Sequence, residues 1–367
     1  MKPRDRVTLS LNRQKPDRCP MQISFTPEFA RRLRADMHLS GRSVHNPHGG
    51  GNTYELERAL GQDLLLTSVG WANSYYANEV YSGGEDSYTD EWGVGWKNSP
   101  YETRFGSGFY TDMVGHPLAD RRALDSYRPP DPHRPELYRE AGHLIAAHKS
   151  EYWIVGVTVT TIFETAWALR GYEQMMMDFS QDTELAETIL EIPFRYHLAA
   201  AKRLVEMGVD MIWIGDDFGT QSGMLISPRV WQRLFKPRMA EFISTLKSIN
   251  PQVKVAYHSD GNIERIIPDL IEIGLDVLNP VQPACMDPAK LKRQYGDKLC
   301  FWGTIDEQFT LPFATAEQVR EQVIERLETV GYDGGLILAP THHVQLDTPL
   351  ENFWAMVHAI TGEQGPA

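Results

Sequence analysis

Five short apolar runs in the last part of the chain each end in polar residues. They read IWIGDDFG, VAYHSDGN, VLNPVQP, CFWGTIDE and LILAPTHHV. Continuous apolar runs of this length indicate buried strands, and the segments between them have the periodicity of amphipathic helices. Alternating strands and helices predict a parallel sheet, and the fold class that we expect is α/β, a (β/α)8 TIM barrel.

The same alternation begins earlier, with the apolar run YWIVGVTVTTIF from Tyr152. A helix after Thr26 is expected because Thr26 is a good N-cap and Pro27 suits the first helical position. A long amphipathic helix is expected over Asp182–Met207, and another over Thr315–Val330. These helices would cover the outside of the barrel.

We expect one barrel domain over residues 1–367, because no low-complexity segment interrupts the alternation of strands and helices. Within it, residues 1–60 form an N-terminal segment and residues 69–112 form an aromatic-rich N-terminal excursion over the barrel mouth. The aromatic residues of interest in this excursion are Trp71, Tyr75, Tyr76, Trp92 and Trp96. Two interpretations stay open, a pocket wall for a planar organic ligand and a hydrophobic cluster beneath a long loop.

The composition restricts the partners and the location. A formal net charge of −13 repels nucleic acid and anionic membranes, so neither is expected, and a small molecule or another protein fits better. The longest apolar run stops after 12 residues, too short to cross a bilayer. The first residues lack the apolar core of a secretion signal, which predicts a cytoplasmic protein. A homodimer is the default oligomeric state.

Two features argue against common kinds of site. Cys19, Cys285 and Cys300 are an odd number without CxxC spacing, which argues against a disulfide framework and against a metal site made of thiolates alone. The glycine-rich stretch HNPHGGGN from His45 lacks the GK[ST] ending of a phosphate-binding loop. We interpret it as a loop rather than a nucleotide site.

The polar residues at the strand ends should gather at one rim, because barrel strands present their carboxyl ends at the same face. His258 and Asp260 are two residues apart at one strand end, so both side chains project to the same side. The whole set comprises Asp216, Asp217, His258, Asp260, Gln282, Asp306, Glu307, His342 and His343.

This rim suggests a metal site, although simple hydrogen bonding within a polar mouth stays an alternative. His258 and Asp260, with His342 from a later strand end, would make a three-ligand zinc site with a fourth position left for substrate. Further ligands or hydrogen-bonding partners would come from the remaining rim residues, among them Gln282 and Asp306.

Metal-free acid/base chemistry on the same rim is also open. Asp216 and Asp217 could supply a carboxylate pair, with His258 or His342 carrying the proton. Adjacent strand residues point to opposite faces, so only one of the two aspartates is expected to face the site. The candidate catalytic residues are therefore Asp216, Asp217, Gln282, Asp306 and His343.

The chain resembles the uroporphyrinogen decarboxylase superfamily over about residues 17–358. The segments that carry the resemblance are PDRCPMQISFTPE, DEWGVGW, FETAWALRGYEQMMMDF, HSDGNI, LNPVQP, WGTID and ILAPTHHVQLDTPLEN. They are closer to the cobalamin-dependent methyltransferase branch than to the decarboxylases, whose arginine-rich RQAGR-type signature is replaced here by SFTPEFARRLRADM. The resemblance implies a (β/α)8 barrel and a methyl transfer to or from a corrinoid held by a partner protein.

In the coenzyme M methyltransferases of this superfamily, a His-x-Cys pair and a later cysteine hold zinc. Matched by motif, His258 keeps the histidine, Asp260 replaces the first cysteine and His342 falls near the later one. A His/Asp/His set is harder than a thiolate set and leaves zinc a stronger Lewis acid. The resemblance thus implies an oxygen or nitrogen leaving group rather than an activated thiol.

Three hypotheses follow. The leading one is a zinc-dependent methyltransferase that moves a methyl group from a small organic donor, with an aryl methyl ether as the candidate, to a corrinoid protein. The alternative is a metal-free lyase, similar to uroporphyrinogen decarboxylase, that acts on a carboxylated substrate. The third is a barrel that has only a binding or assembly role.

Overall fold

The computed structural model describes residues 1–40, 52–69 and 86–362. Its centre is a seven-stranded parallel sheet with the strand order β1-β5-β6-β7-β8-β9-β10. The expected α/β barrel is confirmed, because the strands alternate with helices and all pair in parallel. The strands are β1 (Leu64–Ser68), β5 (Trp153–Val159), β6 (Met211–Gly215), β7 (Lys254–His258), β8 (Val277–Asn279), β9 (Cys300–Ile305) and β10 (Leu336–Pro340).

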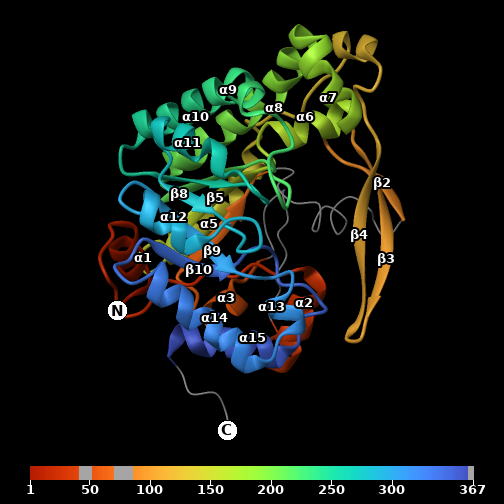
Figure 1. The fold of residues 1–367 in the computed structure, drawn as a ribbon. Coiled ribbons are helices and arrows are strands. Elements are labelled where there is room, and N and C mark those ends of the chain that lie inside the picture. The colour runs from red at the N-terminus through yellow and green to blue at the C-terminus, as the bar shows by residue number, and fades with distance from the viewer. Residues whose placement is uncertain (41–51, 70–85, 363–367) are drawn as a thin grey trace.

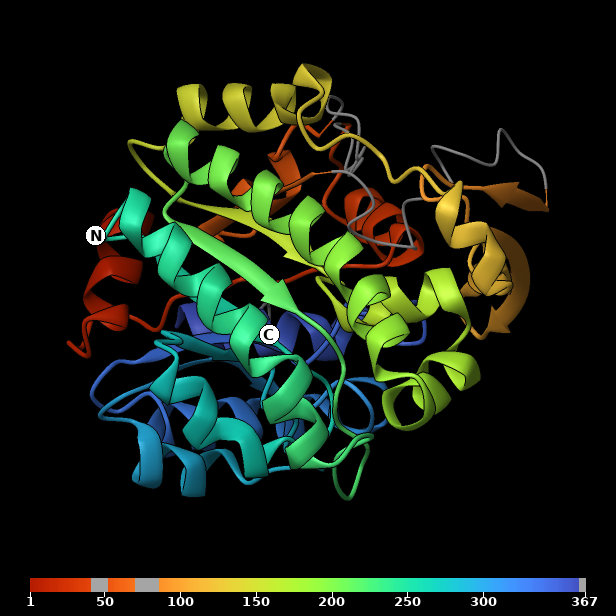
Figure 2. The same ribbon diagram turned by 90° about the horizontal axis from the view of Figure 1, so that it is seen from above.

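Helices surround this sheet (Figure 1). The expected long helix is α8, and Figure 2 shows α8 and α10 running along the outside of β5 and β6. The α-helices are α1 (Pro3–Leu11), α2 (Pro27–Asp36), α3 (Glu55–Ala59), α5 (Arg139–His148), α6 (Phe163–Arg170), α7 (Tyr172–Gln181), α8 (Thr183–Met207), α9 (Pro228–Leu234), α10 (Lys236–Ile249), α11 (Ile267–Glu272), α12 (Pro288–Tyr295), α13 (Thr310–Phe313), α14 (Ala316–Thr329) and α15 (Leu350–Thr361). Three short 3-10 helices are η1 (Arg121–Asp125), η2 (Pro135–Tyr138) and η3 (Glu264–Ile266).

Two of the predicted helix starts are confirmed by their caps. The Thr26 hydroxyl accepts a hydrogen bond from the backbone N–H of Phe29, and Pro27 is the first residue of α2. Thr315 and Gln318 form a reciprocal capping box at the start of α14. In the part of the chain that the structure describes, no helix is long and apolar enough to cross a membrane.

The interior of the barrel is filled by alternate residues of the strands, as the two-residue period of a strand requires. Val7 and Leu11 of α1 pack against one end of this column, and α1 contacts β1, β5 and β10. The strand residues of the column are Leu64, Trp153, Val155, Val157, Met211, Ala256, Val277, Cys300, Trp302, Ile337 and Ala339, with Leu66, Val159 and Trp213 partly buried beside them.

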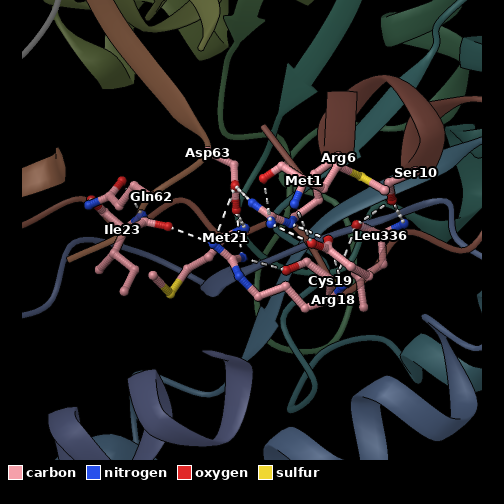
Figure 3. A network of polar contacts seen from close by, with 12 residues as sticks. Met1, Arg6, Ser10, Arg18, Cys19, Met21, Ile23, Gln62, Asp63 and Leu336 are labelled. Carbon is pink, nitrogen blue, oxygen red and sulfur yellow. Dashed lines mark hydrogen bonds and ion pairs between the residues drawn. The ribbon is translucent and has the colours of Figure 1, made fainter. Parts of the chain in front are cut away.

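An extended segment, residues 20–26, occupies the eighth strand position between β10 and β1. On one side Met21 and Leu338 form a parallel bridge, and on the other the Met21 carbonyl accepts the N–H of Asp63 at 2.9 Å. Side chains complete the closure, because the Asp63 carboxylate accepts the Met21 N–H and the Gln62 amide bonds to both backbone groups of Ile23 (Figure 3). The N-terminal segment therefore closes the barrel, a role that its sequence did not reveal.

A second sheet, antiparallel, extends beside the barrel (Figure 1). It consists of β2 (Ser87–Thr89), β3 (Gly95–Thr103) and β4 (Gly106–Gly115). Trp96 of β3 and Trp92, which precedes that strand, are 2% and 1% exposed, so they belong to a hydrophobic cluster and offer no open pocket wall. His45, Trp71, Tyr75 and Tyr76 lie outside the described residues. The division into segments 1–60 and 69–112 stays a prediction.

Candidate active site

A cavity of about 180 Å³ lies at the carboxyl ends of the strands, where the sequence predicted the site. Its wall combines acidic, imidazole, indole and amide side chains from six strand ends and from the closing segment 20–26. The lining residues are Gln22, Ser24, Val159, Thr160, Glu164, Trp213, Asp217, His258, Asn279, Trp302, Pro340, Thr341, His342 and His343. None of these lining residues is a lysine or an arginine, which makes the cavity unsuited to a polycarboxylate.

His258, the last residue of β7, projects into this cavity. Its Nδ1 lies 2.6 Å from Oδ1 of Asn279, which leaves Nε2 directed at two carboxylates. The distances from Nε2 are 3.5 Å to Asp217 Oδ1 and 3.8 Å to Asp260 Oδ1. Burial lowers the pKa of His258, but the charges of Asp260 and Asp217 raise it, and the net shift is upward.

Asp217, His258 and Asp260 form the group that could hold a metal ion, with one ligand atom from each within 4.8 Å of the others. Oδ1 of Asp260 is buried without a hydrogen-bond partner in the described structure, although a buried carboxylate oxygen normally has one. The Asp217 carboxylate accepts the backbone N–H of Asp260 at 2.7 Å and so holds the two ligands together. This donor set and the unsatisfied oxygen fit a bound divalent cation.

His342 and His343, which follow β10, complete the rim. His342 lies beside His258, with 6.4 Å between the two ring centroids, and its own ring is 5.0 Å from that of His343. Burial and the neighbouring His258 lower the pKa of His342 to about 4, so it is neutral near pH 7 and has a lone pair available to a metal ion.

Asp216 and Asp217 point to different places, as strand alternation predicts. The buried Asp216 carboxylate accepts the backbone N–H groups of Ile162 and Glu164, and so caps the start of α6 instead of lining the cavity. Burial raises the pKa of Asp216 to about 7. Asp217 lines the cavity and keeps 38% of its side-chain surface exposed. Of the two, Asp217 is thus the one that a substrate can reach.

Two other predicted site residues bind backbone rather than line the cavity. Gln282 accepts the N–H of Gly261 at 2.5 Å and so supports the turn that carries Asp260. Asp306 accepts N–H groups of Gln308 and Thr310 at the start of α13. Glu307 is nearly buried, and burial together with nearby carboxylates raises its pKa to about 8. Catalytic roles for Gln282 and Asp306 stay predictions.

Among the cavity residues that the sequence reasoning did not select, three have acidic or indole side chains. Glu164, at the start of α6, accepts the N–H of Asp217 at 3.3 Å, and burial with the charges of Asp217 and Asp216 raises its pKa well above the usual value. Trp213 and Trp302 project from β6 and β9 with 4.5 Å between ring centroids. Both tryptophans belong to apolar runs that look like ordinary buried strands. They could be recognised as cavity residues only by knowing which residues of each strand face the barrel interior.

Comparison with known families gives a match over most of the chain. The family model described as Uroporphyrinogen decarboxylase (URO-D) matches residues 104–362. A methylcobamide:CoM methyltransferase of Methanosarcina barkeri is 29% identical over 178 residues, which are 48% of this chain and 49% of that protein. A chloroplastic uroporphyrinogen decarboxylase of Oryza sativa subsp. japonica is 28% identical over 40% of this chain and 34% of its own. The chain thus matches about half the length or less of these curated relatives.

Among solved structures, a methyltransferase from Methanosarcina mazei aligns with the whole chain. The alignment covers 99% of both chains with a TM-score of 0.61 and 22% sequence identity. Similarity at this identity supports the fold alone, and the fold does not determine the chemistry. The chemistry has to be argued from the side chains in the cavity.

Proposed function

Because this chain belongs to the uroporphyrinogen decarboxylase family, we propose that it is a methyltransferase that works with a corrinoid protein. The similarity to a methylcobamide:CoM methyltransferase supports this choice within the family. The observation that carries the proposal is the cluster of Asp217, His258 and Asp260 at the barrel mouth, where a decarboxylase would need cationic groups for its carboxylated substrate. A cytoplasmic location and a homodimer stay predictions.

We propose zinc as the metal, with His258 and Asp260 as ligands and His342 and Asp217 as the two candidates for the third position. Asp217 is favoured by its ligand-atom distances, and His342 by its neutral imidazole. No cysteine lines the cavity, so this site differs from a thiolate-rich one. An oxygen-rich set leaves the ion a stronger Lewis acid than a set of thiolates does.

The proposed donor carries its methyl group on oxygen, and an aryl methyl ether is the first candidate. Trp213 and Trp302 support this choice, because two indoles beside the site offer an apolar wall for a flat ring. In such a transfer the carbon–oxygen bond would break with its electron pair left on oxygen, and a cobalt(I) corrinoid held by the partner would supply the pair for the new bond to carbon. A zinc ion at this site supplies the positive charge that stabilises the leaving oxygen.

The residues of the chain have separate proposed tasks. His258 and Asp260 would hold the cation at the wall, and His343, which lines the cavity, is the candidate to protonate the leaving oxygen. Gln282 holds the turn that carries Asp260, and Asp216 holds the start of α6, which carries Glu164, through the N–H groups that they accept. Asp306 accepts N–H groups at the start of α13, away from these groups. The Glu164 carboxylate accepts the backbone N–H of Asp217 and so holds Asp217 in place.

Metal analysis tests the proposal first. The wild-type protein and the variants His258→Ala, His342→Ala and Asp217→Ala are purified and their zinc content is measured per chain. We expect about one zinc in the wild type, none in His258→Ala, and a loss in whichever of the other two provides the third ligand. Asp306→Ala is the control that keeps its zinc, because its carboxylate binds backbone N–H groups elsewhere.

The activity is then assayed with methoxylated aromatic compounds and a cobalt(I) corrinoid, and the methylated corrinoid is followed by its absorption spectrum. If the wild-type protein binds no zinc and transfers no methyl group, the proposal is refuted. A decarboxylase of the same family is the second candidate, favoured by the description of the family model and the match to a plant decarboxylase. Carbon dioxide release from a carboxylated tetrapyrrole, independent of zinc, would establish it instead.

A further inference from the structure

Asn279, the last residue of β8, lies in the barrel between two other strands of the site. It is 4% exposed, and its side chain bridges β7 and β9. Its Oδ1 faces Nδ1 of His258 at 2.6 Å, and its Nδ2 donates to the backbone carbonyl of Trp302 at 3.0 Å. Both hydrogen-bonding groups of this amide are therefore used.

The chemistry of the partners fixes the orientation of the amide. A backbone carbonyl only accepts, so the Trp302 oxygen must face the NH2 group of Asn279. The carbonyl oxygen of the amide then faces His258, and an oxygen that accepts requires a proton on Nδ1. In the neutral imidazole this leaves Nε2 without a proton and with its lone pair toward the cavity.

The surroundings of Nε2 favour the opposite tautomer. Two carboxylates, Asp217 and Asp260, lie 3.5 Å and 3.8 Å from Nε2 and would attract a proton to it. A proton on Nε2 occupies the lone pair that a metal ion needs. Without a fixed acceptor at Nδ1, the imidazole would turn this N–H to the carboxylates, and the site would be blocked.

We propose that Asn279 is a positioning residue that holds His258 in the tautomer able to bind a metal ion. The strand register supports the role, because His258 and Asn279 are paired residues of neighbouring strands and the Ser259 N–H donates to the Asn279 carbonyl. The inference rests on the proposed metal-dependent function for its purpose. The tautomer itself is a property of the metal-free protein and is tested separately.

The first experiment measures the tautomer of His258 in the metal-free protein. Histidine labelled with 15N is followed by long-range 1H–15N spectra at a pH where His258 is neutral, and His258→Gln identifies its signals. We expect Nδ1–H in the wild type and in Asn279→Asp, which keeps an acceptor. Asn279→Leu should shift the population to Nε2–H. Wild-type tautomer in Asn279→Leu would overturn the proposal.

The second experiment measures zinc affinity by competition with a chromogenic chelator. Asn279→Leu should bind zinc about 10- to 100-fold more weakly, while Asn279→Asp stays within a few-fold of the wild type. Asn352→Leu is the matched control, a fully buried asparagine of α15 whose amide donates to Leu311 and Ala314. It should lower the stability without changing zinc affinity. Equal loss in Asn279→Asp and Asn279→Leu would assign the effect to the lost hydrogen bond with the Trp302 carbonyl, not to the acceptor at Nδ1, and overturn the proposal.

The two experiments separate this inference from the proposed function. If the wild-type protein binds no zinc but its tautomer depends on Asn279, the metal-dependent function fails and the positioning of His258 stands. If zinc binds at the site and the tautomer is the same in all variants, the function stands and the inference on Asn279 fails.

Discussion

Gly215, the last residue of β6, lets its strand pass close to His258. A Cβ at this position would lie 2.5 Å from the His258 Cβ and 2.6 Å from its carbonyl oxygen, so a side chain there must displace β7. Gly215→Ala should therefore lower the free energy of unfolding by about 1–3 kcal/mol. It should also weaken zinc binding, because His258 moves away from Asp260. Urea unfolding and chelator competition measure the two effects.

The matched control is Gly223→Ala in the loop that follows β6. No atom lies within 4 Å of a Cβ added there, so the unfolding free energy should change by less than about 0.5 kcal/mol. If both alanine variants behave like the wild type, the close contact between Gly215 and His258 has no role in holding the site.

At single residues, the sequence predicted the direction of a side chain where the two-residue period of a strand sets it. It failed where contacts with distant residues set it. His258 and Asp260 face one cavity region as their two-residue spacing requires. The backbone-binding carboxylate of Asp216 was not predictable, because its partners lie on α6, more than 50 residues earlier. Glu164 escaped attention since it begins a helix rather than ends a strand.

At the level of elements, closure of the barrel depends on one buried carboxylate. Asp63 is fully buried, and its oxygens lie 2.5 Å from Arg6 Nη1 and 2.7 Å from Arg18 Nη1 (Figure 3). It also accepts the N–H of Met21 in the closing segment. Asp63→Ala would leave buried charge and an N–H without a partner, so we expect a loss of about 3–5 kcal/mol in unfolding free energy.

Asp17→Ala is the control for this prediction, because Asp17 pairs with the same Arg6 but is 40% exposed. A pair at the surface contributes about 0–1 kcal/mol, so this variant should unfold at nearly the wild-type urea concentration. Equal shifts in the two urea midpoints would show that burial of Asp63 does not stabilise the closure.

The elements themselves were largely predictable, and the closure was not. Six of the apolar runs became strands, because a buried parallel strand is apolar on both faces. Residues 20–26 carry no such run. Short backbone pairings with residues near Leu338 and Val344, together with the side chains of Gln62 and Asp63, fix them in the eighth position. The partners that place this segment are distant in the sequence, so no local pattern reveals its position.

For the whole molecule, the junction between the antiparallel sheet and the barrel should make stability depend on pH. His197 of α8 is fully buried there, stacks on Trp92 with 6.0 Å between ring centroids, and neither ring nitrogen has a hydrogen-bond partner in the described structure. Burial lowers its pKa to about 3, well below the ordinary value near 6.5. The folded protein thus holds His197 neutral where the unfolded chain binds a proton.

The sign follows from this difference in proton binding. Between pH 6.5 and pH 3 the unfolded state binds a proton at His197 that the folded state does not bind. The contribution of His197 to the free energy of unfolding is therefore fully present above pH 6.5 and falls by about 1.4 kcal/mol per pH unit on acidification. His197→Leu should remove this share of the slope, and urea unfolding from pH 7 to pH 4 measures it. As the pH falls from 7 to 4, the free energy of unfolding should decrease less in the variant than in the wild type. Parallel curves would mean that His197 is already protonated, or accessible to water, in the folded protein, and that the packing at Trp92 does not exclude charge.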